Sequence, residues 1–440
     1  MSPNRTRTDD HRPGAEIPAA AETTGATEPL AAAERGAVGR AGTERVGGVR
    51  GRWGFLATAY TLLVLIIGTN LPTPLYRGYQ AAFGFSALTV TLIFAAYVAV
   101  LIPSLLVLGP LSDAIGRRRV LLPAVGVAAL ASLVFALAQG TGWLYAARML
   151  QGLAVGAATG ALTAALTELE PRGDRRRAAL VSTVLSVGGI GLGPLVGGLL
   201  AQYLPAPRVL PFVVEIVLLV PAAMAALPEA GHPAGSPART AWRPRRPQLP
   251  AAVRPAFATS GMATLLAFAV VGLFLTLVPT YVTTLSHSGN LLLAGAAVAL
   301  MLACSAVAQL AGYGRPARGL SITGLPLLAA GLVLLAVAGS VSSLALLLVA
   351  TGIAGAGQGL VFLGGLSAVN HAAPPRRRAD VVSSFYVVAY LGVGVPVIGV
   401  GFLATSLGLL VAVRYFAAAV AALCLFVLIV LTVRGHRAGR

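Results

Sequence analysis

Length, composition and charge place this chain in a lipid bilayer. It has 440 residues, of which 57% are hydrophobic and only 10% are charged, and its mean hydropathy is +0.84. A soluble domain carries about 25% charged residues, so the composition argues strongly against a soluble enzyme. The net charge of +18 comes from arginines clustered between apolar runs, which disfavours nucleic-acid binding, and the two cysteines predict neither a disulfide framework nor a metal site.

Residues 1–50 differ from the rest of the chain. They are rich in Ala, Gly, Thr, Glu and Arg and show no sustained apolar periodicity, which predicts a disordered cytoplasmic tail. The chain does not open on an apolar region followed by a cleavage site, so no cleaved signal peptide is expected.

From residue 54 onward, apolar stretches of about 20 residues recur, each long enough to cross the hydrocarbon core of a membrane. They must be helices, because they exceed a barrel strand and because a helix satisfies its own backbone groups in lipid. The sequence therefore predicts an all-α integral membrane protein. Its twelve transmembrane helices are expected at 54–77, 88–112, 119–138, 142–167, 178–201, 208–227, 257–285, 291–313, 321–340, 343–371, 380–404 and 409–433.

The arginines define an orientation for these spans. With the N-terminus in the cytoplasm, the inner segments hold 28 arginines and the outer ends hold three, which are Arg77, Arg208 and Arg414. Because cytoplasmic loops of membrane proteins are rich in Arg and Lys, both termini are predicted to face the cytoplasm, across an inner or plasma membrane.

The spans divide into two similar halves of six. At a shift of 201, Arg175–Ala178 matches Arg376–Ala379. Further upstream, at a slightly different shift, Gln151–Leu153 recurs as Gln358–Leu360. Six spans per half give both halves the same orientation, as in a parallel repeat. The predicted order is a tail at 1–50, an N-terminal six-helix bundle at 51–227, a cytoplasmic linker at 228–256, a C-terminal six-helix bundle at 257–433 and a cytoplasmic tail at 434–440.

The connector between the second and third spans contains Gly109, Asp113, Gly116, Arg117 and Arg118. Asp113 lies at the membrane boundary, where an unpaired carboxylate is costly, and Gly116 permits a tight turn. The arginines can pair with Asp113 or with carbonyls at helix C-termini, which would form a charge clamp that breaks in another conformation. The alternative is an ordinary positively charged inner loop.

This connector resembles the signature loop of the major facilitator superfamily, Gly-x-Leu-x-Asp-x-x-Gly-Arg-Arg. The resemblance implies two six-helix bundles and gives the loop the role of stabilising the outward-facing state. Ala114 departs from the family, which often has a basic residue there. The second-half loop at 312–316 keeps a glycine and an arginine but lacks the Asp, so an asymmetric clamp is expected.

Two charged side chains fall inside the predicted spans rather than at their ends, and charge there is costly. Arg148 opens an Arg-x-x-Gln-Gly string, which by resemblance takes part in proton transfer in antiporters; alternatively, it extends to the outer interface. Glu215 is the only acid well inside a span and is the candidate protonatable carboxyl. Its alternatives are an ion pair with Arg208 or Arg148, or a permanently neutral carboxyl, since the sixth span is peripheral in the family.

Span five contains Gly189, Gly193, Pro194, Gly197 and Gly198. The glycines form a flat seam for a neighbouring helix, and the proline removes one backbone hydrogen bond. The string resembles the antiporter motif of the superfamily's drug exporters, which uptake members usually lack, so it favours export. The alternative is a generic Gly-rich membrane helix.

Polar and aromatic residues within the spans are candidates for a substrate cavity, with packing roles open for each. Asn70 stands where some drug exporters of the family carry an acid, so recognition of a cation by a carboxylate on span one is in doubt. At the end of span four, Glu168 and Glu170 are expected to form an ion-pair cluster with the arginines at 172–177. The cavity candidates are Asn70, Tyr97, Gln151, Tyr281, Gln358, Asn370, Tyr386 and Tyr390.

The sequence has no metalloprotease, nucleophile-elbow or P-loop string, so no enzyme activity, cofactor, metal or ATP site is predicted. These patterns predict a secondary active transporter, driven by protons, that exports a small amphiphilic drug or secondary metabolite. The alternative is an uptake symporter or facilitator for a nutrient such as a sugar or amino acid. A membrane-embedded enzyme or receptor would need a catalytic constellation or a sensory domain, and the sequence contains neither.

Overall fold

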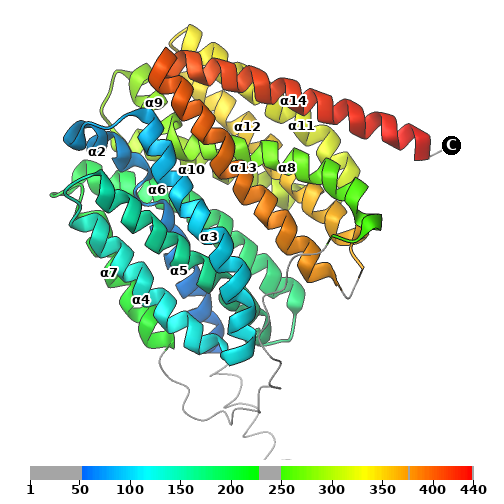
Figure 1. Ribbon diagram of the computed structural model, residues 1–440, viewed down its shortest axis with the longest axis horizontal. Coiled ribbons are helices and arrows are strands. Elements are labelled where there is room, and N and C mark those ends of the chain that lie inside the picture. Colours follow the sequence, from blue (N-terminus) through cyan, green and yellow to red (C-terminus); the bar gives the residue numbers. More distant parts are fainter. Residues whose placement is uncertain (1–51, 227–248, 375–376, 439–440) are drawn as a thin grey trace, which may run out of the picture. The chain divides into compact units, whose positions relative to one another are not determined.

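The structure is a computed structural model that describes residues 52–226, 249–374 and 377–438, all in helices and their connections (Figure 1). The predicted tail at 1–50 and most of the linker at 228–256 lie outside the described residues, and so does the side chain of Asp113. Residues 51–440 belong to one compact unit.

The first half contains six membrane-crossing elements. The first is a helix at residues 52–70, which continues through η1 and α2. The elements that follow are η1 (Thr73–Leu75), α2 (Tyr76–Phe83), α3 (Ala87–Ile115), α4 (Arg117–Ala136), α5 (Thr141–Glu168), α6 (Arg175–Tyr203) and α7 (Leu210–Ala226).

The second half repeats this order. Its elements are η2 (Ala251–Val253), α8 (Arg254–Thr276), α9 (Val278–Ser286), α10 (Leu291–Gly312), α11 (Ala317–Ser340), α12 (Leu344–Ala372), α13 (Arg378–Leu407) and α14 (Leu409–Ala438). Eleven of the described helices are long and apolar enough to cross a membrane, and α7, shorter but apolar, takes the sixth place. The predicted fold class of twelve helices in two six-helix bundles is confirmed.

Prolines divide the first element of each half. The helix at 52–70 ends just before Pro72, and Pro74 lies in the short η1 turn that follows. In the second half, the expected single helix at 257–285 is wrong, because α8 ends at Thr276 and α9 begins with Pro279 in its first turn. Proline lacks a backbone N–H and cannot continue the hydrogen-bond ladder of a preceding helix.

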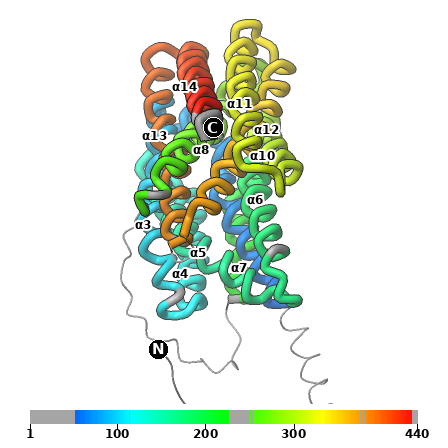
Figure 2. The backbone as a smooth tube through the Cα atoms, turned by 90° about the vertical axis from the view of Figure 1, so that its right-hand side faces the viewer, coloured from blue at the N-terminus to red at the C-terminus, as the bar shows by residue number. Residues whose placement is uncertain are grey.

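The halves meet through pairs of equivalent helices. α3 and α10 are the second crossing helices of their halves, and α6 and α13 are the fifth. The second helix of each half packs on the fifth helix of the other, so that α3 lies beside α13 and α6 beside α10 (Figure 1). In a second view the end of α6 adjoins α10 (Figure 2). Buried apolar side chains of both halves, such as Phe94, Leu101 and Phe274, form one shared core.

Candidate functional site

Arg148 lies in the interior of the first half. It is 0% exposed, so it does not extend to the membrane interface. Its Nε donates a hydrogen bond to the Tyr76 hydroxyl at 2.6 Å, and its Nη1 donates to the Thr69 carbonyl at 2.6 Å and to Gln151 Oε1 at 3.0 Å. The guanidinium is therefore held by α2, by the first helix and by its own helix α5.

The remaining surface of the guanidinium is covered by aromatic rings. Its central carbon lies 5.5 Å from the ring centre of Tyr76, 5.3 Å from Phe94, 5.7 Å from Tyr97 and 6.0 Å from Phe135. Rings at such distances attract a cation through their electron-rich faces. Nη2 has no hydrogen-bond partner among the described residues, so this buried cation keeps the two N–H donors of Nη2 free.

The broken first helix supplies the acceptors of this cluster. The Gly68 carbonyl would normally accept from the N–H of the residue four positions later, which is Pro72 and has none. The Gly68 carbonyl accepts instead from the Leu71 N–H at 3.3 Å and from Gln151 Nε2 at 3.2 Å, while Arg148 donates to the Thr69 carbonyl at the helix end. The prolines of span one therefore leave backbone oxygens available to α5.

Glu215 belongs to the same cluster. It lies on α7, is 4% exposed, and its carboxyl rests so closely on Gly68 that an added Cβ there would overlap Oε1. The carboxyl interacts with the Ser132 side chain through a hydrogen bond and with Arg148 through its charge. Its Oε2 has no hydrogen-bond partner among the described residues. Within the described part of the chain, Glu215 forms no ion pair with Arg148 or with Arg208. The structure thus brings a buried acid and a buried base together without a direct salt bridge.

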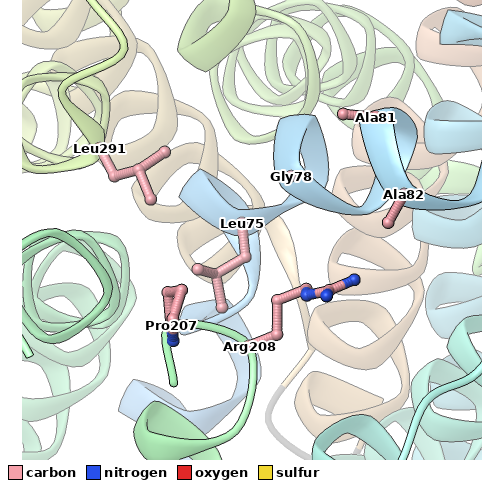
Figure 3. A pocket seen from close by; sticks show the side chains of 7 residues that line it. All are labelled: Leu75, Gly78, Ala81, Ala82, Pro207, Arg208 and Leu291. Carbon is pink, nitrogen blue, oxygen red and sulfur yellow. The ribbon is translucent and has the colours of Figure 1, made fainter. Parts of the chain in front are cut away.

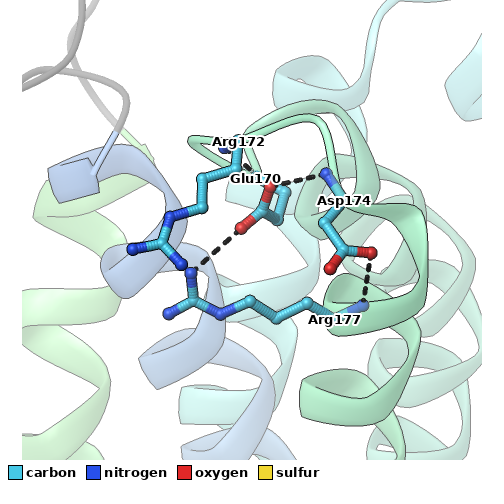
Figure 4. Close-up of polar contacts among 4 residues, drawn as sticks. All are labelled: Glu170, Arg172, Asp174 and Arg177. Carbon is cyan, nitrogen blue, oxygen red and sulfur yellow. Dashed lines mark hydrogen bonds and ion pairs between the residues drawn. The ribbon is translucent and has the colours of Figure 1, made fainter.

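The connectors after α3 and α5 form a charge cluster. Arg117 Nη2 lies 2.7 Å from Glu168 Oε1. The buried Glu170 carboxylate accepts from the backbone N–H groups of Arg172 at 2.7 Å and Asp174 at 2.8 Å, and pairs with Arg177 at 3.2 Å (Figure 4). The predicted pairing with the arginines at 172–177 holds for Glu170, through Arg177. Among the described residues Glu168 pairs instead with Arg117, which ties the signature connector to the end of α5.

The glycine string of α6 packs on two neighbours at once. A Cβ at Gly189 would lie 2.8 Å from the Ile66 side chain, and at Gly193 or Gly197 it would meet backbone carbonyl oxygens of the first helix and the turn after it. On another face, a Cβ at Gly198 would meet the Leu291 backbone of α10, and one at Gly295 would meet the Pro194 carbonyl. The seam joins α6 both to its own half and to the opposite half.

Four of the predicted cavity residues are buried and already bonded to protein groups. Gln151 is part of the Arg148 cluster, and Asn70 donates weakly to the Ile66 carbonyl at 3.5 Å. Gln358 accepts from the Ser305 hydroxyl at 2.6 Å, and the fully buried Tyr281 donates to the Leu335 carbonyl at 3.0 Å. These contacts tie Gln358 and Tyr281 to the packing of the second half.

The other predicted cavity residues keep some exposure. Asn370, Tyr386 and Tyr390 are half-buried, and Tyr97 is 8% exposed. Tyr386 lies beside Phe362 of α12, with ring centres 6.3 Å apart. Aromatic contacts then continue to Phe268 of α8 at 5.1 Å from Phe362. The structure therefore groups Tyr386 with phenylalanines that sequence reasoning did not single out, and leaves Asn370 apart from the Arg148 cluster.

A pocket of about 410 Å³ lies at the end of the helices opposite the Arg117 connector (Figure 3). It opens between α2, the turn before α7 and the start of α10. Arg208 provides its one charged side chain, and its lining is otherwise apolar. The lining residues are Leu75, Gly78, Ala81, Ala82, Pro207, Arg208 and Leu291.

Comparison with known protein families identifies the chain. The Major Facilitator Superfamily model matches residues 56–318, which is more than half of its length. The chain belongs to the major facilitator superfamily. This multi-pass membrane protein is therefore a member of a family of transporters of small molecules rather than of enzymes, as the signature connector predicted.

Individual relatives of this superfamily member match over shorter segments. A puromycin resistance protein of Streptomyces alboniger is 36% identical over 159 residues, which is 34% of this chain and 30% of that protein. A cephamycin export protein of Amycolatopsis lactamdurans is 30% identical over 221 residues, which is 48% of this chain and 44% of that protein. The aligned part of the chain thus spans less than half the length of either relative.

Solved structures share the fold. A nucleoside transporter aligns with a TM-score of 0.68 and 12% identity over 86% of this chain and 99% of that chain. A bacterial homologue of the human lysosomal transporter Spinster, inward-facing and occupied, aligns with a TM-score of 0.68 and 15% identity over 87% of this chain and 96% of that chain. At these identities, the likeness is one of fold alone.

Sequence reasoning missed several partners of Arg148 in this protein. Tyr76 follows the proline pair of span one, and that break is a usable signal, because it predicts free carbonyls beside a polar ring. Phe94 and Phe135 carry no such signal, since phenylalanine is common in any membrane span. Their role depends on how α3 and α4 pack around α5.

Proposed function

We propose that this transporter exports a small amphiphilic molecule, a drug or a secondary metabolite, in exchange for protons. The two relatives described above are named for puromycin resistance and cephamycin export, and the glycine string of α6 resembles that of drug exporters. The observation that carries the proposal is the buried cluster in which Arg148 and Glu215 lie close without forming a salt bridge.

Proton exchange at Glu215 would act on the first helix. An ionised carboxylate without a direct counter-ion is costly in an apolar interior, so its charge state is coupled to the position of Arg148. The Glu215 carboxyl rests on Gly68, whose carbonyl also accepts from Gln151. Gain or loss of a proton there changes the forces between α7, α5 and the first helix, and so favours one conformation of the half.

Alternating access would expose the two ends of the helices in turn as the bundles rock. The arginine distribution supports an inner location for both termini and for the Arg117 connector. Hydrogen bonds between the halves at the opposite end, from Leu88 to Thr405 and from Leu291 to Gln202, support a closed outer end. In this scheme Gly109, Asp113, Gly116, Arg117 and Arg118 clamp the inner end when the outer end opens.

The direction of transport is tested in cells with and without this chain, challenged with a panel of amphiphilic antibiotics. Export lowers the internal level of at least one compound and raises the concentration needed to inhibit growth. If no compound is exported and a sugar or amino acid accumulates instead, the chain is an uptake symporter or facilitator, and the export proposal is wrong.

Glu215→Gln is expected to remove the pH dependence of transport. The amide is nearly isosteric with the protonated carboxyl but cannot release a proton, so coupled export against a gradient should cease while the folded protein remains. Transport in vesicles is measured at several external pH values for both proteins. Asp380→Asn, which alters an acid in the first turn of α13, outside both the buried cluster and the Arg117 connector, is the control and should keep the wild-type profile. A Glu215→Gln profile identical to that of the wild type would show that this carboxyl carries no coupled proton.

A further inference from the structure

The interfaces between the halves share a feature at the starts of two helices. Leu88, the second residue of α3, donates its backbone N–H to the Thr405 hydroxyl oxygen on α13 at 3.0 Å. Leu291, the first residue of α10, donates its backbone N–H to Gln202 Oε1 on α6 at 2.8 Å. In both cases the second crossing helix of one half receives an acceptor from the fifth helix of the other.

Each of these helices also has a cap of its own. Ser86 Oγ accepts from the Thr89 N–H at 3.3 Å at the start of α3, and Asn290 Oδ1 accepts from the Leu293 N–H at 3.1 Å at the start of α10. The first N–H groups of a helix have no partner within the helix, and one local cap satisfies only part of them. The acceptor from the opposite half therefore fills a position that the local cap leaves open.

The Thr405 hydroxyl is oriented for this role. It donates its own proton to the Gly401 carbonyl one turn earlier at 2.9 Å, which leaves its oxygen lone pairs free to accept from Leu88. Close backbone packing adjoins both caps. Gly401 lies against Thr91 of α3, and Gly198 lies against the Leu291 backbone of α10, with no room for a Cβ at either glycine. The acceptors reach their donors because the halves are seated this closely.

We propose that Thr405 and Gln202 are positioning residues that latch the two halves together by capping helices of the opposite half. The latch lies at the end opposite the Arg117 connector and joins equivalent helices, as the repeat requires. When that end opens, both N–H groups lose their acceptors and must turn to water. Thr405 and Gln202 thus bias the equilibrium between closed and open forms. The place of this bias in a transport cycle rests on the proposed alternating access, whereas the latch itself is measurable without transport.

The test measures how often the latched end opens in the full-length protein in lipid nanodiscs. Thr91 is 0% exposed and lies under Gly401 of the other half, so Thr91→Cys reacts with a small water-soluble maleimide only when the halves part. Cys304 is replaced by serine, while the fully buried Cys424 is retained. The labelling rate then follows the open fraction.

Thr405→Val and Gln202→Leu should each raise the labelling rate about threefold, and together about tenfold, since both caps are exposed to competing water and lie at separate interfaces. Gln202→Glu keeps an acceptor, which a helix N-terminus favours as an anion, and should label no faster than the parent. Ser406→Ala is the matched control, because among the described residues that hydroxyl bonds only to carbonyls of its own helix.

Unchanged rates in both capping variants, or a Gln202→Glu rate equal to that of Gln202→Leu, would overturn the latch. All these side chains are exposed, so the variants are expected to fold, and elution as a monodisperse peak checks this. The labelling result does not depend on a transported substrate. Failure of proton-coupled export would therefore leave the latch standing, and failure of the latch would leave the export proposal standing.

Discussion

Arg148→Lys is expected to reduce transport by about 100-fold while the protein still inserts and folds. Lysine keeps the charge but presents a single ammonium, which cannot replace the planar guanidinium that donates to Tyr76, Thr69 and Gln151 at once. Hydrogen bonds from a charged group are worth about 1.5–3 kcal/mol each, and a loss of about 3 kcal/mol in the conformation that carries transport corresponds to about 100-fold in rate.

The experiment compares initial transport rates of Arg148→Lys and the wild type in reconstituted vesicles, together with their melting temperatures. Arg208→Lys is the control, because Arg208 lines an open pocket and its guanidinium is exposed; it should transport like the wild type. The ring faces around Arg148 accept any cation, so Arg148→Met should be more damaging than the lysine variant. Full activity of Arg148→Lys would show that this cluster only provides packing.

Gly193→Leu is expected to abolish the recovery of folded protein. A Cβ at this position of α6 would lie 2.5 Å from the Ile67 carbonyl oxygen and 3.0 Å from the Asn70 side chain. The clash is with backbone, so no rotamer change relieves it, and the cost should reach or exceed the upper end of the roughly 1–3 kcal/mol typical of overpacking. Gly193→Ala should have a smaller effect in the same direction.

Gly188 on the same helix provides the matched control. A Cβ there would meet nothing within 4 Å, and leucine is a better helix former than glycine, so Gly188→Leu should fold like the wild type. Yield after size-exclusion chromatography and melting temperature are measured for the variants. If Gly193→Leu gave as much folded protein as Gly188→Leu, the close approach of α6 to the first helix would be wrong.

The helices were predictable from the sequence, because the length of an apolar run fixes whether a helix can cross a bilayer. The breaks within these runs were not predicted: the span expected at 54–77 is interrupted after residue 70, just before Pro72 and Pro74, and the first span of the second half is also broken. There, Pro279 divides the helix expected at 257–285. A single proline in a long apolar run does not reveal whether the helix bends or ends, since tertiary packing decides this.

Only the site residues whose placement inside a membrane span is energetically costly could be predicted from the sequence. A charge inside a span is expensive, and this selected Arg148 and Glu215, which the structure brings into one cluster. Polarity alone also selected Gln358 and Tyr281, which bond to protein groups of the second half. Sequence polarity does not show whether a side chain faces a cavity or a neighbouring helix, because that depends on how the helices are rotated in the bundle.

Export through this chain is proposed to be driven by protons. Its most direct test is substrate efflux from vesicles that contain the purified full-length protein and carry an imposed pH gradient. Acidification of the side receiving the substrate should accelerate efflux, and collapse of the gradient by an ionophore should abolish the acceleration. Efflux by Glu215→Gln should respond to neither change. Efflux by the wild-type protein at one rate under every gradient would contradict this proposal.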